Sequence, residues 1–189
     1  MTRLWLVRHG PTHSRAFAGW RDIPADLSDT AAIARLNAYL PTGALLISSD
    51  LIRATATADA IGANRTRLPH APALREFHFG DWDGMNFTEV STQWPTLSRM
   101  YWEEPGTVAP PNGESWDQGA QRMNAAVDAL IGTHPDIIIV AHFGMILTQV
   151  QRALNISPYD ALSHPIDNLS VTQITHNGTW SCGPINHKP

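Results

Sequence analysis

The stretch Leu4-Trp5-Leu6-Val7-Arg8-His9-Gly10 changes abruptly from apolar to charged. Leu4 to Val7 is a short apolar run, typical of a parallel strand buried on both faces. Arginine rarely follows such a strand unless an anion or a carboxylate meets it, because burying an unpaired charge is costly. Gly10 allows the backbone to turn sharply and to approach a ligand closely. The stretch therefore predicts a buried strand that ends in a binding site, although a lone histidine there is often only a core residue.

Strands and helices alternate along the rest of the chain. Further strands are expected near residues 44–47, 66–68, 136–141 and 169–175. Helices are expected from Ser28, as N-cap, to Leu40, and then near residues 51–61, 86–103, 114–131 and 144–154, with an interruption at Pro95. This alternation favours an α/β fold of three layers, α/β/α, with a mostly parallel central sheet.

The length of 189 residues suits one domain with a single sizeable core. The sequence contains no internal repeat and no linker that would mark a boundary. We therefore expect one domain over residues 1–189. Residues 85–113, which end in a proline-rich loop, are expected to form a helical and loop insertion over one end of the sheet and over the site there.

Three of the expected strands run directly into polar sequence. The segments are Arg8-His9-Gly10, Ser48-Ser49-Asp50 and Ala141-His142-Phe143-Gly144. In an open α/β sheet, ligands bind beyond the carboxyl ends of the strands. The sequence therefore predicts that these three segments converge on one crevice.

Charge and composition exclude several kinds of partner. The formal net charge of −4 gives no overall attraction to nucleic acid or to an anionic membrane, so an anionic ligand needs a local group of cations. Lys188 is the only lysine, and the other basic residues are arginines, which grip phosphate with two parallel hydrogen bonds. An RNA-acting protein is disfavoured by the same charge balance and by the lack of interleaved aromatic and basic residues.

The number of cysteines, the length of the apolar runs and the spacing of the histidines predict the cellular compartment and whether a metal is bound. The single cysteine, Cys182, forms no intrachain disulfide, and no apolar run approaches the roughly 20 residues that span a bilayer. The N-terminus reaches Arg8 too early for the apolar region of a signal peptide, so we expect a cytoplasmic protein. Apart from His9 and His142, the histidines are scattered and none of them pairs with another at the spacing of metal ligands, so we expect neither a metal nor a cofactor.

Several segments, in order along most of the chain, resemble the histidine phosphatase superfamily in its phosphoglycerate mutase-like branch. The first is Leu6-Val7-Arg8-His9-Gly10-Pro11-Thr12, which is similar to the family signature. The others are Gly19 to Pro24, Ser48 to Ala58, Leu74 to Gly84, Pro111 to Ser115 and Val140 to Gly144. Each match is weak alone, and their common order makes the resemblance strong.

The resemblance implies a phosphatase that hydrolyses a small phosphate monoester through a phosphohistidine on His9. Arg8, Arg53 and His142 are then expected to clamp the phosphate, because the charge of a phosphoryl group in transfer lies on its equatorial oxygens. Clustered positive charge is expected to keep His9 deprotonated. Glu76 is the expected general acid and base, and its pKa should be raised by burial or by an anionic ligand.

Some of these residues have other interpretations. Glu76 is also compatible with a structural salt bridge to Arg75, and Asp81 and Asp83 are the alternative acids. Arg53 alone would suit a helix surface, and His142 alone would suit the core.

The chain departs from the family pattern at two positions. Arg15 stands where the family commonly has asparagine, so it either adds a cation, binds a second anionic group or points outward. Phe143 stands where glycine is usual after the second histidine, and its ring is expected to reshape the pocket wall. Trp20 and His78 are further candidates for contact with substrate at the mouth of the pocket.

Two other functions stay open at this point. One is a cofactor-dependent phosphoglycerate mutase, which usually needs a longer lid and an extended segment after the acid. The other is a non-catalytic phosphate-binding regulatory module, which the presence of all five central residues disfavours. The expected partner is a small phosphorylated substrate, and a homodimer is possible.

Overall fold

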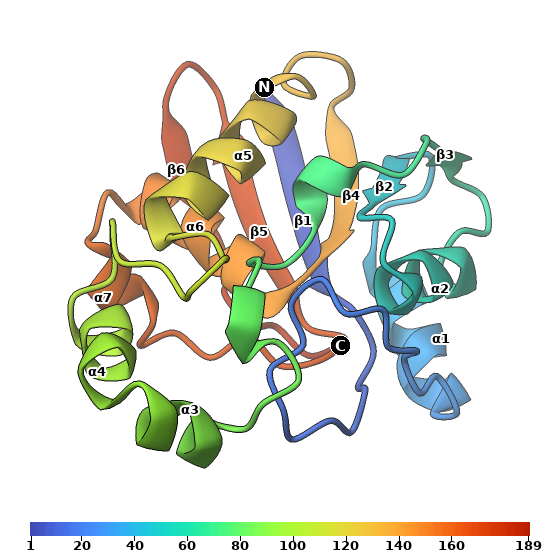
Figure 1. Cartoon of the computed structure of the whole chain (residues 1–189). Coiled ribbons are helices and arrows are strands. Elements are labelled where there is room, and N and C mark those ends of the chain that lie inside the picture. Colours follow the sequence, from blue (N-terminus) through green and yellow to red (C-terminus); the bar gives the residue numbers. More distant parts are fainter.

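The computed structural model describes all residues, 1–189, and contains one six-stranded sheet with the strand order β3-β2-β4-β1-β5-β6 (Figure 1). The strands are β1 (Thr2–Arg8), β2 (Leu45–Ser48), β3 (Thr66–Arg67), β4 (Asp136–Ala141), β5 (Val171–His176) and β6 (Trp180–Cys182). The strands β1 to β4 pair in parallel, whereas β5 and β6 are antiparallel to their neighbours. The expected α/β fold with a mostly parallel sheet is confirmed.

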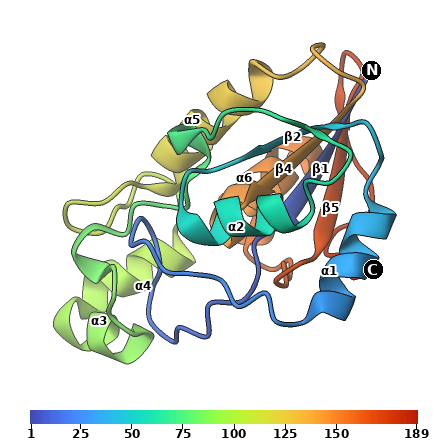
Figure 2. The ribbon, with the colours of Figure 1, turned by 90° about the vertical axis from the view of Figure 1, so that its right-hand side faces the viewer.

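Helices cover both faces of this sheet (Figures 1 and 2). One face carries α5 (Trp116–Asp128) and α6 (Phe143–Leu154), and the other carries α1 (Thr30–Tyr39) and α2 (Ile52–Ala60). The apolar run of β4 explains why both faces are covered. Ile137 and Ile139 pack in one core cluster with α5 and α6, whereas Ile138 and Val140 pack in a second cluster with α1 and α2. Successive side chains of a strand point to opposite faces, so a continuous apolar strand needs a layer on each side.

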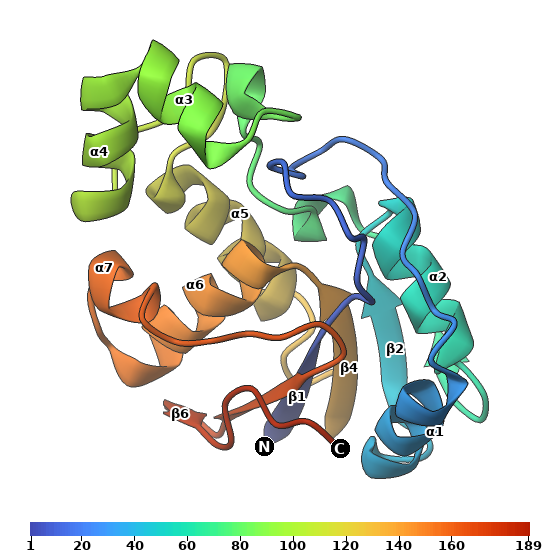
Figure 3. The same cartoon turned by 90° about the horizontal axis from the view of Figure 1, so that it is seen from below.

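The remaining helices lie at one end of the sheet. Helices α3 (Phe87–Gln93) and α4 (Pro95–Glu103) lie near the ends at which β1 and β4 finish, and the short helix α7 (Pro158–Ala161) lies beside α4 (Figures 1 and 3). Pro95 divides α3 from α4, as the sequence predicts, because proline cannot continue a helix but suits its first turn. No helix is both long and apolar enough to cross a bilayer.

The element boundaries differ from the sequence prediction in a few places. Asp29, not Ser28, is the N-cap of α1, because its carboxylate accepts the backbone N–H of Ala32. The expected loop before Gly84 contains two short 3-10 helices, Pro72–Leu74 and Gly80–Trp82. Neither α7 nor β6 was predicted; α7 is a short helix capped by Ser157, and β6 is a three-residue strand that pairs with β5.

Arg65 joins the ends of α1 and α2. Its guanidinium donates to the carbonyls of Asn37 at 3.0 Å and Leu40 at 2.9 Å, at the C-terminus of α1. It also donates to the carbonyl of Ile61 at 2.6 Å, just after α2. A cation in this position satisfies carbonyls that have no partner within their helices and interacts favourably with the helix dipoles.

We predict that Arg65→Met lowers the free energy of unfolding by about 2 kcal/mol, because several buried carbonyls lose a charged donor. Urea unfolding of the variant and the wild type measures the difference. Arg99→Met is the matched control, because Arg99 is 67% exposed and makes only a long ion pair within α4. Equal losses in the two variants would show that Arg65 does not join the helices.

Candidate active site

Three strand ends meet at one edge of the sheet, as the sequence predicts. Arg8 pairs with Ala141 in the register of β1 and β4, so His9 and His142 leave the sheet side by side. The centroids of their rings lie 5.1 Å apart. Ser48 pairs with Val140 in the register of β2 and β4, which places Ser49 next to His142.

His9 is held in one tautomer. Its Nδ1 lies 2.7 Å from the carbonyl oxygen of Gly10, and only a protonated nitrogen can donate to that acceptor. In the neutral ring, Nε2 therefore carries a free lone pair. The ring is 6% exposed, and burial lowers the pKa of His9 to about 3. This pKa already includes the opposing hydrogen bond to Gly10 and the contributions of the nearby cations Arg53 and Arg8, so the expected effect of positive charge is present but is smaller than that of burial.

The backbone around His9 is fixed from two sides. The side chain of Asn168 donates to the carbonyl of His9 at 2.8 Å, and the N–H of Gly10 donates to the hydroxyl of Thr57 at 2.9 Å. A Cβ at Gly10 would lie 2.5 Å from the end of the Leu27 side chain, so a larger residue here would displace that leucine.

His142 is fully buried, and its Nε2 lies 2.7 Å from the hydroxyl oxygen of Ser49. Its Nδ1 has no hydrogen-bond partner. Burial, followed by the neighbouring His9 and Arg53, keeps the pKa of His142 well below its ordinary value. His142 is therefore a neutral hydrogen-bonding group in this structure and not a third cation.

Arg8, which is half-buried, and Arg53, which is buried, are the two cations of the site. Arg8 donates to the carbonyl of Ile166 at 2.6 Å, and its Nε has no partner. Arg53 is 1% exposed and donates to three carbonyls of the loop before α1, at Ala18, Gly19 and Arg21. Its Nε is also without a partner. Arg53 therefore holds the loop in place as well as supplying charge.

Glu76 lies at the same site with its carboxylate buried. One oxygen accepts the N–H of Phe77 at 3.0 Å, and the other accepts the N–H of Gly144 at 3.2 Å. Burial raises the pKa of Glu76, while these N–H groups and the two arginines oppose the rise. The expected direction is confirmed. A Cβ at Gly144 would lie 2.7 Å from the Glu76 carboxylate, so glycine at this position makes room for the acid.

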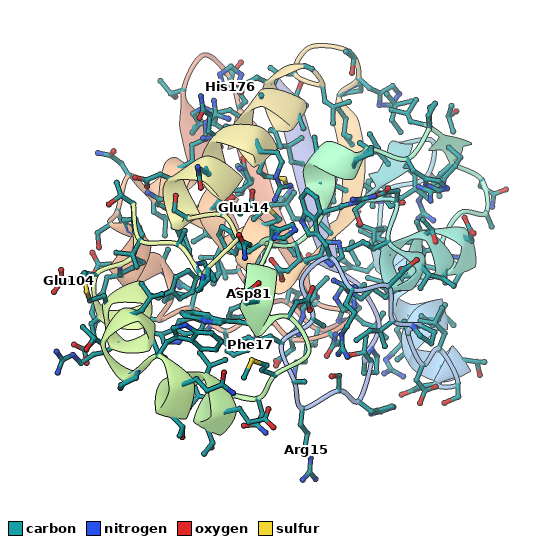
Figure 4. All side chains as sticks on the ribbon, viewed as in Figure 1. Arg15, Phe17, Asp81, Glu104, Glu114 and His176 are labelled. Carbon is teal, nitrogen blue, oxygen red and sulfur yellow. The ribbon has the colours of Figure 1, made fainter.

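The structure gives other partners to the residues that the sequence left open as an ion-pair partner of Glu76 or as alternative acids. Arg75 forms its ion pair with Asp50, not with Glu76. Asp83 accepts the N–H groups of Gly19 and Arg21, and the exposed Asp81 accepts the side-chain amide of Asn112 (Figure 4).

The loop that carries Glu76 is fixed by Arg122 of α5, a residue that the sequence prediction missed. Arg122 donates to the carbonyls of Ala73 at 2.7 Å, Arg75 at 2.9 Å and Glu76 at 3.2 Å. It also forms an ion pair with Glu114, whose carboxylate accepts the N–H of His78 at 3.0 Å. Arg122 lies two turns after the N-cap of α5 and therefore on the same face of the helix as that N-cap. This spacing was the only signal in the sequence for the position of Arg122.

Most, but not all, of the other candidates for contact with substrate lie close to Glu76 or Arg8. Trp20 donates from its indole to the carbonyl of Glu76 at 2.8 Å, and its ring centroid lies 4.5 Å from that of His78. Phe143 begins α6, and the guanidinium carbon of Arg8 lies 5.4 Å from its ring centroid. Arg15 is exposed and extends away from the body of the molecule (Figure 4), so the structure does not bring it to the other site residues.

We predict that His9 makes the protein less stable in acid. The folded-state pKa of about 3 lies below the ordinary value, so the unfolded state binds the proton first as the pH falls. The stability that His9 contributes is complete above its unfolded pKa of about 6.5 and is lost progressively below it. The loss approaches about 1.4 kcal/mol per pH unit between the two values.

Urea unfolding of the wild type and of His9→Asn between pH 8 and pH 4.5 measures this effect. The stability difference between the two proteins should be constant near pH 8 and should then change in favour of His9→Asn as the pH falls. Parallel profiles over the whole range would contradict the assigned protonation state.

Comparison with known proteins agrees with this geometry. A glucosyl-3-phosphoglycerate phosphatase of Mycolicibacterium vanbaalenii is 33% identical over 94% of this chain and 82% of its own length. A 2,3-bisphosphoglycerate-dependent phosphoglycerate mutase of Bartonella tribocorum is 36% identical over 62% of this chain and 63% of its own. The solved structure of Bacillus stearothermophilus YhfR matches with a TM-score of 0.87 and 28% identity, over 96% of this chain and 95% of that one.

The family assignment rests on nearly the whole chain. Residues 4–183 match the family described as the histidine phosphatase superfamily, branch 1. This range includes all three strand ends, the loop of Glu76 and the helices α3 and α4. The chain belongs to the histidine phosphatase superfamily and is an enzyme, a phosphatase.

Proposed function

We propose that this phosphatase hydrolyses a small phosphate monoester through a phosphohistidine on Nε2 of His9. The observation that carries the proposal is the hydrogen bond from Nδ1 of His9 to the carbonyl of Gly10. It leaves the lone pair of Nε2 free beside His142, and the low pKa keeps the ring neutral at physiological pH. A neutral imidazole is the form that can attack phosphorus.

In the first step, Nε2 attacks phosphorus, an N–P bond forms and the bond from phosphorus to the ester oxygen breaks. Glu76 in its protonated form gives its proton to the departing oxygen, so that an alcohol leaves. In the second step, water attacks phosphorus, Glu76 takes one proton from that water, and the N–P bond breaks. Inorganic phosphate leaves, and His9 and Glu76 return to their starting states.

The charges of the site suit this sequence of steps. Arg8 and Arg53 each have an unpaired buried Nε, and both act on His9 and Glu76 electrostatically. In a buried site, fixed cations stabilise the charge of the transferring phosphoryl group more strongly than they would in water. His142 contributes a hydrogen bond and not a charge.

Hydrolysis is favoured over mutase activity by the extent of the similarity. The phosphatase relative matches 94% of the chain, whereas the mutase relative matches 62%. A non-catalytic role is disfavoured because the nucleophile, the acid and both cations lie together in one buried site. We further propose that residues 85–113, which include α3 and α4, form the insertion that covers the substrate.

We predict that the wild type releases inorganic phosphate from small phosphomonoesters, including an aryl phosphate, and that His9→Ala loses this activity. Brief mixing with ³²P-labelled substrate should leave an acid-labile, base-stable label on the wild type and none on His9→Ala. Asn168→Ala, which removes a contact to the backbone of His9 but keeps the ring, should still acquire the label. Label on His9→Ala would refute the nucleophile, isomerised product without free phosphate would indicate a mutase, and no release from any ester would refute hydrolysis.

We predict that Arg122 positions the acid. Arg122→Gln should reduce kcat for alkyl phosphates, which have poor leaving groups, by about tenfold or more, and should reduce kcat for aryl phosphates less. Glu76→Gln should show the same pattern more strongly, because it removes the proton donor itself. A KM that changes as much as kcat would indicate a binding role instead.

Arg152→Gln is the matched control for Arg122→Gln. Arg152 is similarly half-buried, with 23% of its side chain exposed, and forms an ion pair with Asp128. It contacts no part of the Glu76 loop in the structure, so its loss should affect both classes of ester equally. If Arg122→Gln also lost activity equally toward alkyl and aryl phosphates, the role of Arg122 would be purely structural.

A further inference from the structure

An apolar cavity adjoins the carboxylate of Glu76. Its walls come from α4, from the proline-rich loop after α4, from the start of α6 and from the segment after α7. The side chains that define it are Glu76, Tyr101, Trp102, Val108, Phe143 and Leu162. We refer to this cavity as the apolar pocket. Two of its walls, α4 and the loop after it, belong to the segment 85–113 that lies at the carboxyl end of the sheet (Figure 3).

The position of the apolar pocket relates it to the leaving group of the ester. The phosphoryl group must lie against His9, Arg8 and Arg53, at the polar strand ends. The departing oxygen must lie against Glu76, because that residue supplies its proton. A substituent on that oxygen that continues past Glu76 enters the apolar pocket, because Glu76 lines this pocket and also interacts electrostatically with Arg53 and Arg8.

The lining determines which substituent fits. Glu76 is the only acidic residue that lines the apolar pocket, and no arginine, lysine or histidine lines it. Burial raises the pKa of Tyr101, so its phenol is a neutral group there. A carboxylate or second phosphate on the leaving group would lose its water without gaining a cation, which is strongly unfavourable. Arg15, the one candidate cation for such a group, extends into solvent (Figure 4).

The size and polarity of the apolar pocket further restrict the leaving groups that fit. The cavity has a volume of about 40 Å³, enough for a short alkyl group or the edge of a ring. Phe143 and Gly144 form part of its wall, and a Cβ at Gly144 would lie 2.5 Å from the ring of Phe77 and 2.7 Å from the Glu76 carboxylate, so the packing on this side is tight. A polyhydroxylated leaving group would bury hydroxyls with few hydrogen-bond partners, which is unfavourable.

We propose that the substrate is the phosphate ester of an uncharged, apolar alcohol, whose short alkyl group or ring edge enters the apolar pocket. This inference rests on the proposed function and adds the chemical class of the leaving group. The phosphate is bound at the polar ends of the strands. The remainder of the substrate is selected by the aromatic and aliphatic side chains that line the apolar pocket.

The test compares esters that differ only in the leaving group. Benzyl phosphate and 4-carboxybenzyl phosphate have alcohol leaving groups of similar reactivity, and glycerol 1-phosphate represents a polyol. The wild type should show a kcat/KM for benzyl phosphate about tenfold or more above that for each of the other two. Equal values would overturn the inference while leaving phosphatase function intact, and hydrolysis of none of the three would count against the proposed function itself.

A variant tests the location of the selectivity. Val108→Arg places a cation on the wall of the apolar pocket, so the ratio of kcat/KM for 4-carboxybenzyl phosphate to that for benzyl phosphate should rise by about tenfold or more. Thr107→Arg is the matched control, because Thr107 is the neighbouring β-branched residue, is exposed and does not line the pocket. Its ratio should stay close to that of the wild type.

A second variant, Leu162→Arg, places the same charge on the opposite segment, after α7. It should raise the same ratio and covers the case in which Val108→Arg fails to fold. Unchanged ratios in the folded variants would show that the leaving group does not enter the apolar pocket. An equal rise in Thr107→Arg would show that the effect is a long-range one of added charge.

Discussion

The parallel register of β1 with β4 is the constraint on which the rest of the site depends. It pairs Arg8 with Ala141, and the next residue of each strand is therefore a histidine at the same level of the sheet. The register itself is fixed by the core. A slip of one residue would move the side chains of β4 from one packed face of the sheet to the other, against a different set of helices. Packing of the two faces thus determines the chemistry at the edge.

Burial then sets the protonation states that the chemistry uses. The same loss of water that lowers the pKa of His9 raises the pKa of Glu76. In the proposed mechanism, the neutral His9 is the nucleophile and Glu76 is the acid that can hold a proton, and opposite pKa shifts of this kind are expected of paired catalytic groups. Arg8 and Arg53 limit the rise at Glu76 and add to the fall at His9. The site therefore combines two cations with two neutral histidines, and buried polar groups are held by backbone carbonyls and N–H groups.

Polar and apolar recognition are divided between two parts of the fold. The ends of β1, β2 and β4 lie together through the strand register and carry groups that we propose hold the phosphate. The segment of α3 and α4 faces this edge and supplies aromatic and aliphatic side chains. Arg122 couples the two parts indirectly, because it holds the backbone of the loop from which Glu76 reaches the apolar pocket.

The sequence by itself determined the α/β alternation, the buried strands and the five residues Arg8, His9, Arg53, Glu76 and His142, because apolar periodicity and short motifs are local properties. Tertiary structure alone decided the tautomer of His9, the neutral state of His142 and the outward direction of Arg15. It also decided that Arg122 donates to the backbone carbonyl of Glu76 and that the N–H of Gly144 donates to its carboxylate. These features arise from contacts between segments far apart in the chain and from the burial that those contacts produce, and no local pattern encodes either.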